Sequence, residues 1–161
     1  MTTYKETQPQ ETQEQPTQET AITGTSQPNE LPILSTGNAT LPAPWCSFKA
    51  DTLEQKKRLY RAMTNPDSKL SDCINMVINL VDAYIEWAEV THDQTGEIEQ
   101  VPRVVLFDAD GKTYTATSKG IYNSLYRLFV VFGVPHWETP IPVKIRQVQN
   151  GERRYYSLDI A

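Results

Sequence analysis

The pattern of apolar and polar residues between residues 103 and 132 predicts a β-hairpin followed directly by a helix. Residues 104–107 form a short apolar run, and residues 112–117 alternate with a period of two, as a β-strand does. Residues 108–111 between them, Asp-Ala-Asp-Gly, are typical of a tight turn. After Ser118 the period changes to three and four, as on one face of a helix, with apolar residues at Ile121, Leu125, Leu128, Phe129 and Phe132.

This helix has predicted signals at both ends. Ser118 or Thr117 can cap it by accepting hydrogen bonds from the free N–H groups of the first turn. Gly133, followed by Pro135, is expected to end it. Two strands that lead straight into a capped helix indicate that the helix packs back on the sheet to which those strands belong.

Residues 72–90 predict a long strand with an irregularity in its middle. Apolar residues occupy even positions up to Leu80 and odd positions from Val81 onward. An inserted residue, a β-bulge, would keep both sets on one face and would bend the strand, as a barrel requires. The alternative is a helix, because Ile74, Val77, Ile78 and Val81 also fit a period of 3.6; the many β-branched residues favour the strand.

Shorter signals complete the prediction. Thr52 and Gln55 have the spacing of a capping box and begin a helix that ends at Asn65-Pro66. A polar connection at residues 91–100 is expected to join the first long strand to the second. Near the C-terminus, residues 141–146 and 153–160 alternate as two strands, and Asn150-Gly151 between them is a strong hairpin signal.

This order of elements predicts a mostly β fold, a five-stranded OB-fold barrel with a helix between strands 3 and 4. A short N-terminal helix and a disordered tail precede it. The expected divisions are a tail at residues 1–32, an extended arm and short helix at 33–70, and the OB-fold domain at 71–161. The Pro-rich arm, from Leu31 to Phe48, is expected to dock through its large apolar residues, either on its own barrel or on a neighbouring subunit.

Composition sets the N-terminal tail apart. Residues 1–30 hold eight Thr, six Gln, five Glu and three Pro, so they cannot bury enough apolar surface to offset the entropy lost on ordering. There is no signal-peptide pattern and no apolar run of membrane-spanning length, so we expect a soluble protein in the cytoplasm of its cell. The isolated Cys46 and Cys73 favour reduced thiols over a disulfide framework or a zinc site.

Charge is distributed in blocks along the chain. Residues 1–30 carry −4, residues 31–71 carry +3, residues 72–99 carry −7 and residues 100–161 carry +3, within a net charge of −5. The overall acidity argues weakly against nucleic-acid binding. The acid, however, is concentrated in the tail and in one hairpin region, which leaves the C-terminal part of the chain basic.

Several stretches resemble the small OB-fold single-stranded-DNA-binding proteins carried by phages and conjugative plasmids of Gram-positive bacteria. The resemblance covers about residues 70–160, and the stretches that carry it are 105–108, 110–114, 116–125, 132–133, 135–141 and 143–145. It implies a non-enzymatic protein that binds single-stranded DNA in replication, recombination or transfer of a mobile element inside a bacterial host. RNA is the alternative ligand, and the sequence does not distinguish the two. Cellular single-strand binders usually end in an acidic tail, whereas here the acidic tail is N-terminal.

A sequence-tolerant binder of single strands needs cations for the phosphates and exposed aromatic rings on which bases stack. In OB-folds these lie on strands two and three and on the loops that flank them. The candidates on the central and final hairpins are Arg103, Lys112, Tyr114, Lys144, Arg146, Arg153, Arg154 and Tyr155. Tyr114 and Tyr155 are the first to test, although each could equally be a half-buried strand tyrosine, and the cations could be ordinary solvated charges.

Catalytic and metal sites find little support. Asp108 and Asp110 have a spacing that metal ligands can have, but their place in a hairpin turn favours a backbone role. His92 and His136 lie far apart without an evident nucleophile. We therefore expect no enzyme activity, no metal and no cofactor. Lys119 at a helix start is unfavourable for the helix dipole and hints at a nearby anion.

The second hypothesis is a protein–protein interaction module that recruits a basic partner through its acidic first strand. The positions of Asp82, Glu86 and Glu89 separate the two hypotheses. If these acids line the groove, their charge repels phosphate and DNA binding becomes implausible. Self-association along DNA through the Leu31–Phe48 arm is a further possible partnership.

Overall fold

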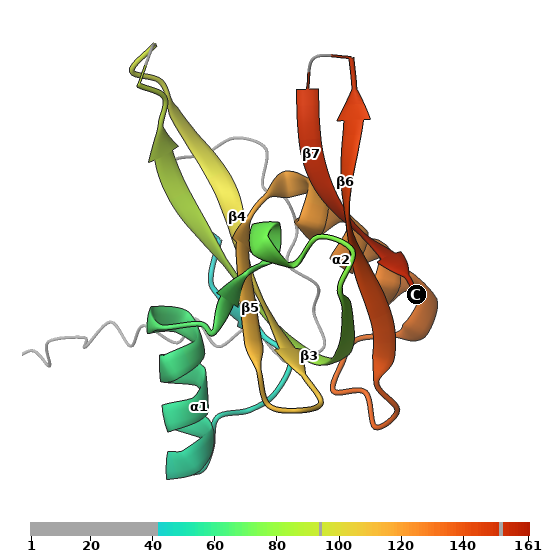
Figure 1. Cartoon of the computed structure of the whole chain (residues 1–161). Coiled ribbons are helices and arrows are strands. Elements are labelled where there is room, and N and C mark those ends of the chain that lie inside the picture. The colour runs from blue at the N-terminus through green and yellow to red at the C-terminus, as the bar shows by residue number, and fades with distance from the viewer. Residues whose placement is uncertain (1–41, 94, 152) are drawn as a thin grey trace, which may run out of the picture.

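The computed structural model describes residues 42–93, 95–151 and 153–161, which form one curled sheet with two α-helices (Figure 1). The predicted tail, and the arm before Pro42, lie outside these residues, so self-association through that part of the arm stays a prediction. The helices are α1 (Leu53–Thr64), the 3₁₀ turn η1 (Leu70–Cys73) and α2 (Lys119–Phe132). The strands are β1 (Trp45–Cys46), β2 (Ser68–Lys69), β3 (Val77–Thr91), β4 (Ile98–Asp108), β5 (Thr113–Thr117), β6 (Ile141–Asn150) and β7 (Arg153–Ile160).

The strand order is β2-β5-β4-β3-β6-β7, and β1 pairs separately with β3. Two of these seven strands, β1 and β2, were not predicted, because two residues are too few to show a period. Along the described residues no ladder joins β5 to β7, so the sheet is a half-barrel with a seam between these strands. The β3–β4 and β6–β7 hairpins extend beyond the seam (Figure 1). They are called the two hairpin arms below, to distinguish them from the N-terminal arm of residues 31–48.

The predicted bulge in β3 is present. The register of β3 against β4 shifts between Leu80 and Asp82. The extra residue brings Ile78 and Leu80 from before the shift, and Ala83, Ile85 and Trp87 from after it, into one core. β3 begins at Val77, later than predicted, because η1 and Asn75, with φ of 66°, occupy the residues before it.

The capping predictions hold for both helices. Thr52 and Gln55 form the capping box of α1, and Ser118 Oγ accepts the Ile121 N–H at the start of α2. Gly133, with φ of 81°, follows α2 and supplies the left-handed backbone that other residues rarely adopt. In the β4–β5 turn Gly111 has φ of 83° for the same reason.

Apolar residues form two layers, one on each face of the central strands. The concave face of the sheet packs against α2, and this core includes Trp45 from the arm. The opposite face packs against α1 through Ala62, Tyr84, Val105 and Phe107, with Phe48 from the arm beside them. The run at residues 104–107 is continuously apolar because both faces of β4 are covered. Trp45 and Phe48 therefore dock on their own subunit.

Candidate nucleic-acid interface

The β6–β7 hairpin brings together most of the predicted binding residues. Opposed residues of an antiparallel pair share a face of the sheet, so Lys144, Arg146 and Tyr155 lie on its outer face, opposite Asp159, Ser157 and Val148. Tyr155 is 43% exposed and can present its ring to solvent. Arg146 Nε lies 2.9 Å from Asp159 Oδ2, and this exposed ion pair contributes little to stability.

Arg153 and Arg154 begin β7, next to the hairpin tip. Arg154 pairs with Gln149 across the hairpin and is exposed, on the opposite face from Tyr155. The backbone of Arg153 pairs with that of Asn150. The hairpin therefore carries an exposed aromatic ring on the same face as Lys144 and Arg146, with Arg154 exposed on the other face. Cations together with an exposed ring are what single-stranded nucleic acid needs.

The central hairpin does not present its predicted residues in the same way. Tyr114 is only 5% exposed and belongs to the core, and burial raises the pKa of its hydroxyl. Its ring is packed opposite Leu106 and offers no free face to a base. The alternation at residues 112–117 is as clear as that at 153–160, but the face that carries Tyr114 is the one that the core covers. Lys112 is exposed in the β4–β5 turn, at the far end of the molecule from the β6–β7 tip (Figure 1).

Arg103 is a structural tie rather than a free cation. Its guanidinium donates to Glu86 and to the Met63 carbonyl oxygen at the end of α1. It therefore joins β3, β4 and α1, and its charge is already paired.

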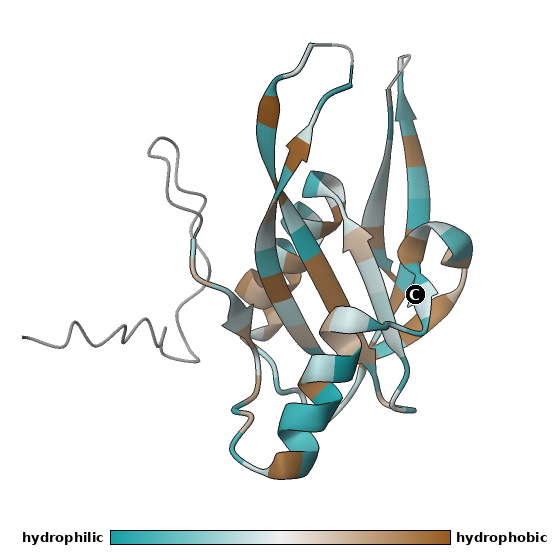
Figure 2. Cartoon of the chain, turned by 90° about the vertical axis from the view of Figure 1, so that its left-hand side faces the viewer, coloured by the Kyte–Doolittle hydropathy of each residue, from teal (hydrophilic) through white to brown (hydrophobic). Residues whose placement is uncertain are grey.

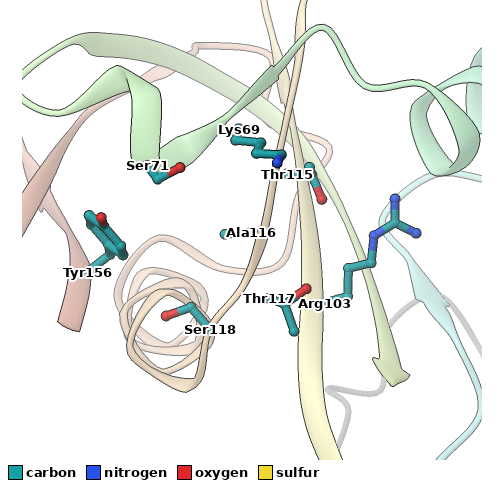
Figure 3. Close-up of a pocket in the computed structure, with 8 residues that line it drawn as sticks. All are labelled: Lys69, Ser71, Arg103, Thr115, Ala116, Thr117, Ser118 and Tyr156. Atoms are coloured by element: carbon teal, nitrogen blue, oxygen red, sulfur yellow. The ribbon is translucent and has the colours of Figure 1, made fainter. Parts of the chain in front are cut away.

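A cavity of about 240 Å³ lies at the seam between β5 and β7, beside η1 and the start of α2 (Figure 3). Its walls are rich in hydroxyl groups and carry two cations: the lining residues are Lys69, Ser71, Arg103, Thr115, Ala116, Thr117, Ser118 and Tyr156. Thr115 and Ser118 already bond within the fold, to the Val104 carbonyl and the Ile121 N–H. No local signal in the sequence marks Lys69, Thr117 and Tyr156 as parts of one site, because β2, β5 and β7, which carry them, lie far apart in the chain.

The comparisons with known proteins identify the family. The chain matches the Phi29 phage SSB family model, described as phage single-stranded DNA-binding protein, over residues 43–161. The chain belongs to this family. The match extends the resemblance seen in the sequence to include the arm residues Trp45 and Phe48 and the whole of α1. Searches of curated proteins and of solved structures each found no match.

Two of the three acidic residues of β3 that were singled out in the sequence, Asp82 and Glu86, are held within the fold of this family member. Asp82 is 1% exposed; its carboxylate accepts from Ser47 Oγ at 2.8 Å and lies 3.1 Å from His136 Nδ1 and 3.6 Å from Arg58 Nη1. Glu86 accepts from Arg103 and from the Tyr84 hydroxyl, and burial together with Glu86 raises the Tyr84 pKa. Of the three acids that separate the two hypotheses, only Glu89 is exposed.

An anion also lies at the start of α2, as Lys119 suggested. Glu99 of β4 accepts from Lys119 Nζ and lies 3.0 Å from His92 Nε2. Lys119, and then His92, lower the pKa of Glu99. These contacts tie the β3–β4 arm to α2 and leave Lys119 engaged within the fold.

The described residues contain no group of three histidine, cysteine or acidic side chains that could hold a metal ion. Asp108 Oδ1 instead accepts the Asp110 N–H within its own turn, at 3.2 Å. Neither described α-helix has the length and apolarity needed to cross a membrane.

Proposed function

We propose that this protein coats single-stranded DNA with little sequence preference during replication, recombination or transfer of a phage or related mobile element, in the cytoplasm of a bacterial host. The observation that carries this proposal is the family match over residues 43–161. The exposed ring and cations of the β6–β7 hairpin support it, because stacking and phosphate contacts do not depend on base identity.

We propose further that β3 to β7 are the five strands of an OB-fold. The pairs β3–β4, β4–β5, β3–β6 and β6–β7 are those expected for strands 1 to 5 of that fold, with α2 between strands 3 and 4. OB-fold barrels are partly open, and the seam between β5 and β7 agrees with this. In this assignment the two hairpin arms are the loops that flank the binding groove.

In this proposal the strand crosses the seam between the two arms. One base stacks on Tyr155, while phosphates meet Lys144, Arg146 and Arg153 at positions on the same face of the β6–β7 hairpin. The strand then passes the edge of β7, where it meets Arg154 on the other face, and reaches Lys69 at the seam. The hydroxyl groups of the seam cavity would bond to sugars or base edges without selecting a sequence. Tyr114 has no stacking role here, because its ring is in the core.

A fluorescence-anisotropy titration tests the function. Labelled oligo(dT) of about 30 nucleotides, a matched duplex and a matched RNA are each titrated at two salt concentrations. We expect the single strand to bind more tightly than the duplex and to bind less tightly at high salt. The titration with RNA shows whether the protein tolerates the 2′-hydroxyl group. Absence of single-strand binding at low salt would refute the proposal.

Replacement of Tyr155 by Ala should weaken oligo(dT) binding by about 1–3 kcal/mol, the usual value of one stacked base. The matched control is Tyr126→Ala on α2, because Tyr126 is 42% exposed, almost the same as Tyr155. The control should bind as the unchanged protein does. Equal losses for the two variants would remove Tyr155 from the interface.

Replacement of Arg153 and Arg154 together by Gln should reduce the salt dependence of binding. Each lost phosphate contact lowers the slope of log K against log salt by about 0.7 for a single strand, so the expected change is about 1.4. Arg127→Gln, an exposed cation on α2, is the control. An unchanged slope in the double variant would show that the β6–β7 tip does not contact phosphate.

A further inference from the structure

The outer face of α1 carries the most exposed aromatic side chain of the described residues. Tyr60 is 67% exposed, compared with 43% for Tyr155. Packing does not account for it, since the buried side of α1 is supplied by Leu59, Ala62 and Met63. Tyr60 is thus a ring in solvent on a rigid helix of 12 residues, about 18 Å long.

Two unpaired cations lie beside this ring on α1, one on the same helix face and one on the adjacent face. Lys56 is one turn before Tyr60 and Arg61 directly follows it, and both are exposed. Among the described residues neither forms an ion pair. The other two cations of α1 are engaged: Lys57 pairs with Glu54, and Arg58 lies over the Phe48 and Phe107 rings. Figure 2 shows the outward side of α1 as mainly hydrophilic, apart from its first turn.

The adjacent face of α1, which carries Arg61, is connected to the seam through the edge of the sheet. A second cavity, of about 420 Å³, separates α1 from the β4–β5 turn, and Arg61, Asn65, Asp67 and Thr113 help to line it. Thr115 lines the seam cavity and lies on the same side of β5 as Thr113, about 7 Å along the strand. The two cavities are therefore neighbours along β5 and the short strand β2 that pairs with it.

Two carboxylates line this path, and both have partners: Glu54 pairs with Lys57, and Asp67 is held within the fold. Asp67 Oδ2 accepts from the Thr113 N–H at 2.7 Å and from its hydroxyl at 2.8 Å. These two bonds lower the pKa of Asp67, so it is ionised at neutral pH. Cations lie on both sides of Asp67 along this path. Arg61 is on the side of α1, and Lys69 is on the side of the seam cavity.

We propose that the outer face of α1 is a second contact surface for single-stranded DNA, on which Tyr60 stacks a base and Lys56 and Arg61 contact phosphates. The surface extends the strand's path from the seam cavity along β2 and onto α1. This inference rests on the proposed function, because it takes the same ligand. An exposed ring between unpaired cations matches a single strand, whose bases are free to stack, better than a duplex, whose bases are enclosed.

The length of the oligonucleotide tests this surface separately from the seam. Tyr60→Ala is titrated with oligo(dT) of about 8 and of about 30 nucleotides, the first long enough for one barrel only. We expect binding of the long strand to weaken about 5-fold or more and binding of the short strand to stay unchanged. Tyr60→Phe, which keeps the ring, should bind both as the unchanged protein does, and Tyr126→Ala is the control for loss of an exposed tyrosine.

The cations are tested in the same way with Lys56→Gln and Arg61→Gln combined. The salt slope should fall by about 1.4 for the long strand only. Unchanged binding of the long strand, or equal losses at both lengths, would overturn the second surface. A gain in affinity would also overturn it, since the loss of a DNA contact cannot strengthen binding.

Failure of the function itself would look different. If the unchanged protein bound neither strand, the proposed function would be wrong before α1 was tested. Thermal unfolding of each variant should match that of the unchanged protein, because all three side chains face solvent.

Discussion

Arg58→Met should lower the free energy of unfolding by about 2–3 kcal/mol, because it leaves the buried Asp82 carboxylate without its permanent cation. Met keeps the apolar contact with the Phe48 and Phe107 rings, so the loss reports mainly on charge. Arg58 is itself partly exposed, which places the expected value below that of a fully buried pair. Urea denaturation followed by circular dichroism measures it.

Asp82 has this influence because it joins separate parts of the chain. It lies at the bulge of β3 and contacts Ser47 after β1, Arg58 of α1 and His136 after α2. The variant Asp82→Asn combined with Arg58→Met should lose less than the sum of the two single changes, since the uncompensated charge is then absent.

A matched control comes from the same helix. Lys57→Met removes a cation that pairs only with the exposed Glu54, so it should change stability by less than about 0.5 kcal/mol. Equal effects for Arg58 and Lys57 would show that the Asp82 cluster does not hold α1 to the sheet.

Gly120→Ala should destabilise the protein by about 1–3 kcal/mol, although alanine is the better helix former by about 1 kcal/mol. A Cβ at Gly120 would lie 2.3 Å from the Tyr156 carbonyl oxygen of β7. A backbone oxygen cannot move aside as a flexible side chain can, so the clash outweighs the gain in propensity. Urea denaturation gives the sign.

The same substitution should also weaken single-strand binding. The new Cβ would lie 3.3 Å from Cδ2 of Tyr155, the ring on which we propose that a base stacks. Asn123→Ala, an exposed position one turn further along α2, is the control and should change neither stability nor binding. A Gly120→Ala protein as stable as the unchanged one would mean that α2 and β7 are not in this close contact.

Local signals determined much of the fold. The period of two, the period of three to four, the caps at Thr52 and Ser118 and the glycine at 111 depend only on neighbouring residues, so they could be read directly. The change of parity at Leu80 and Val81 even located the bulge, because a one-residue shift has no other way to keep both halves on one core.

The binding residues show the limit of that reading. Tyr114 and Tyr155 both alternate on strands beside cations, and nothing local distinguishes them. Tyr114 is buried because core elements distant in sequence cover its face, whereas Tyr155, although it lies beside Gly120 of α2, stays 43% exposed. The same holds for Arg103 and Asp82, whose partners lie 17 to 54 residues away in the chain.

By itself, therefore, the sequence determined the longer strands and the two α-helices, their order, the bulge and the resemblance to single-stranded DNA-binding proteins. Tertiary structure alone decided which faces are covered, which charges are paired, and that Lys69, Thr117 and Tyr156 meet at one cavity. The reason is physical: periodicity gives each strand or helix two distinct faces, but which face meets solvent depends on contacts between elements far apart in sequence.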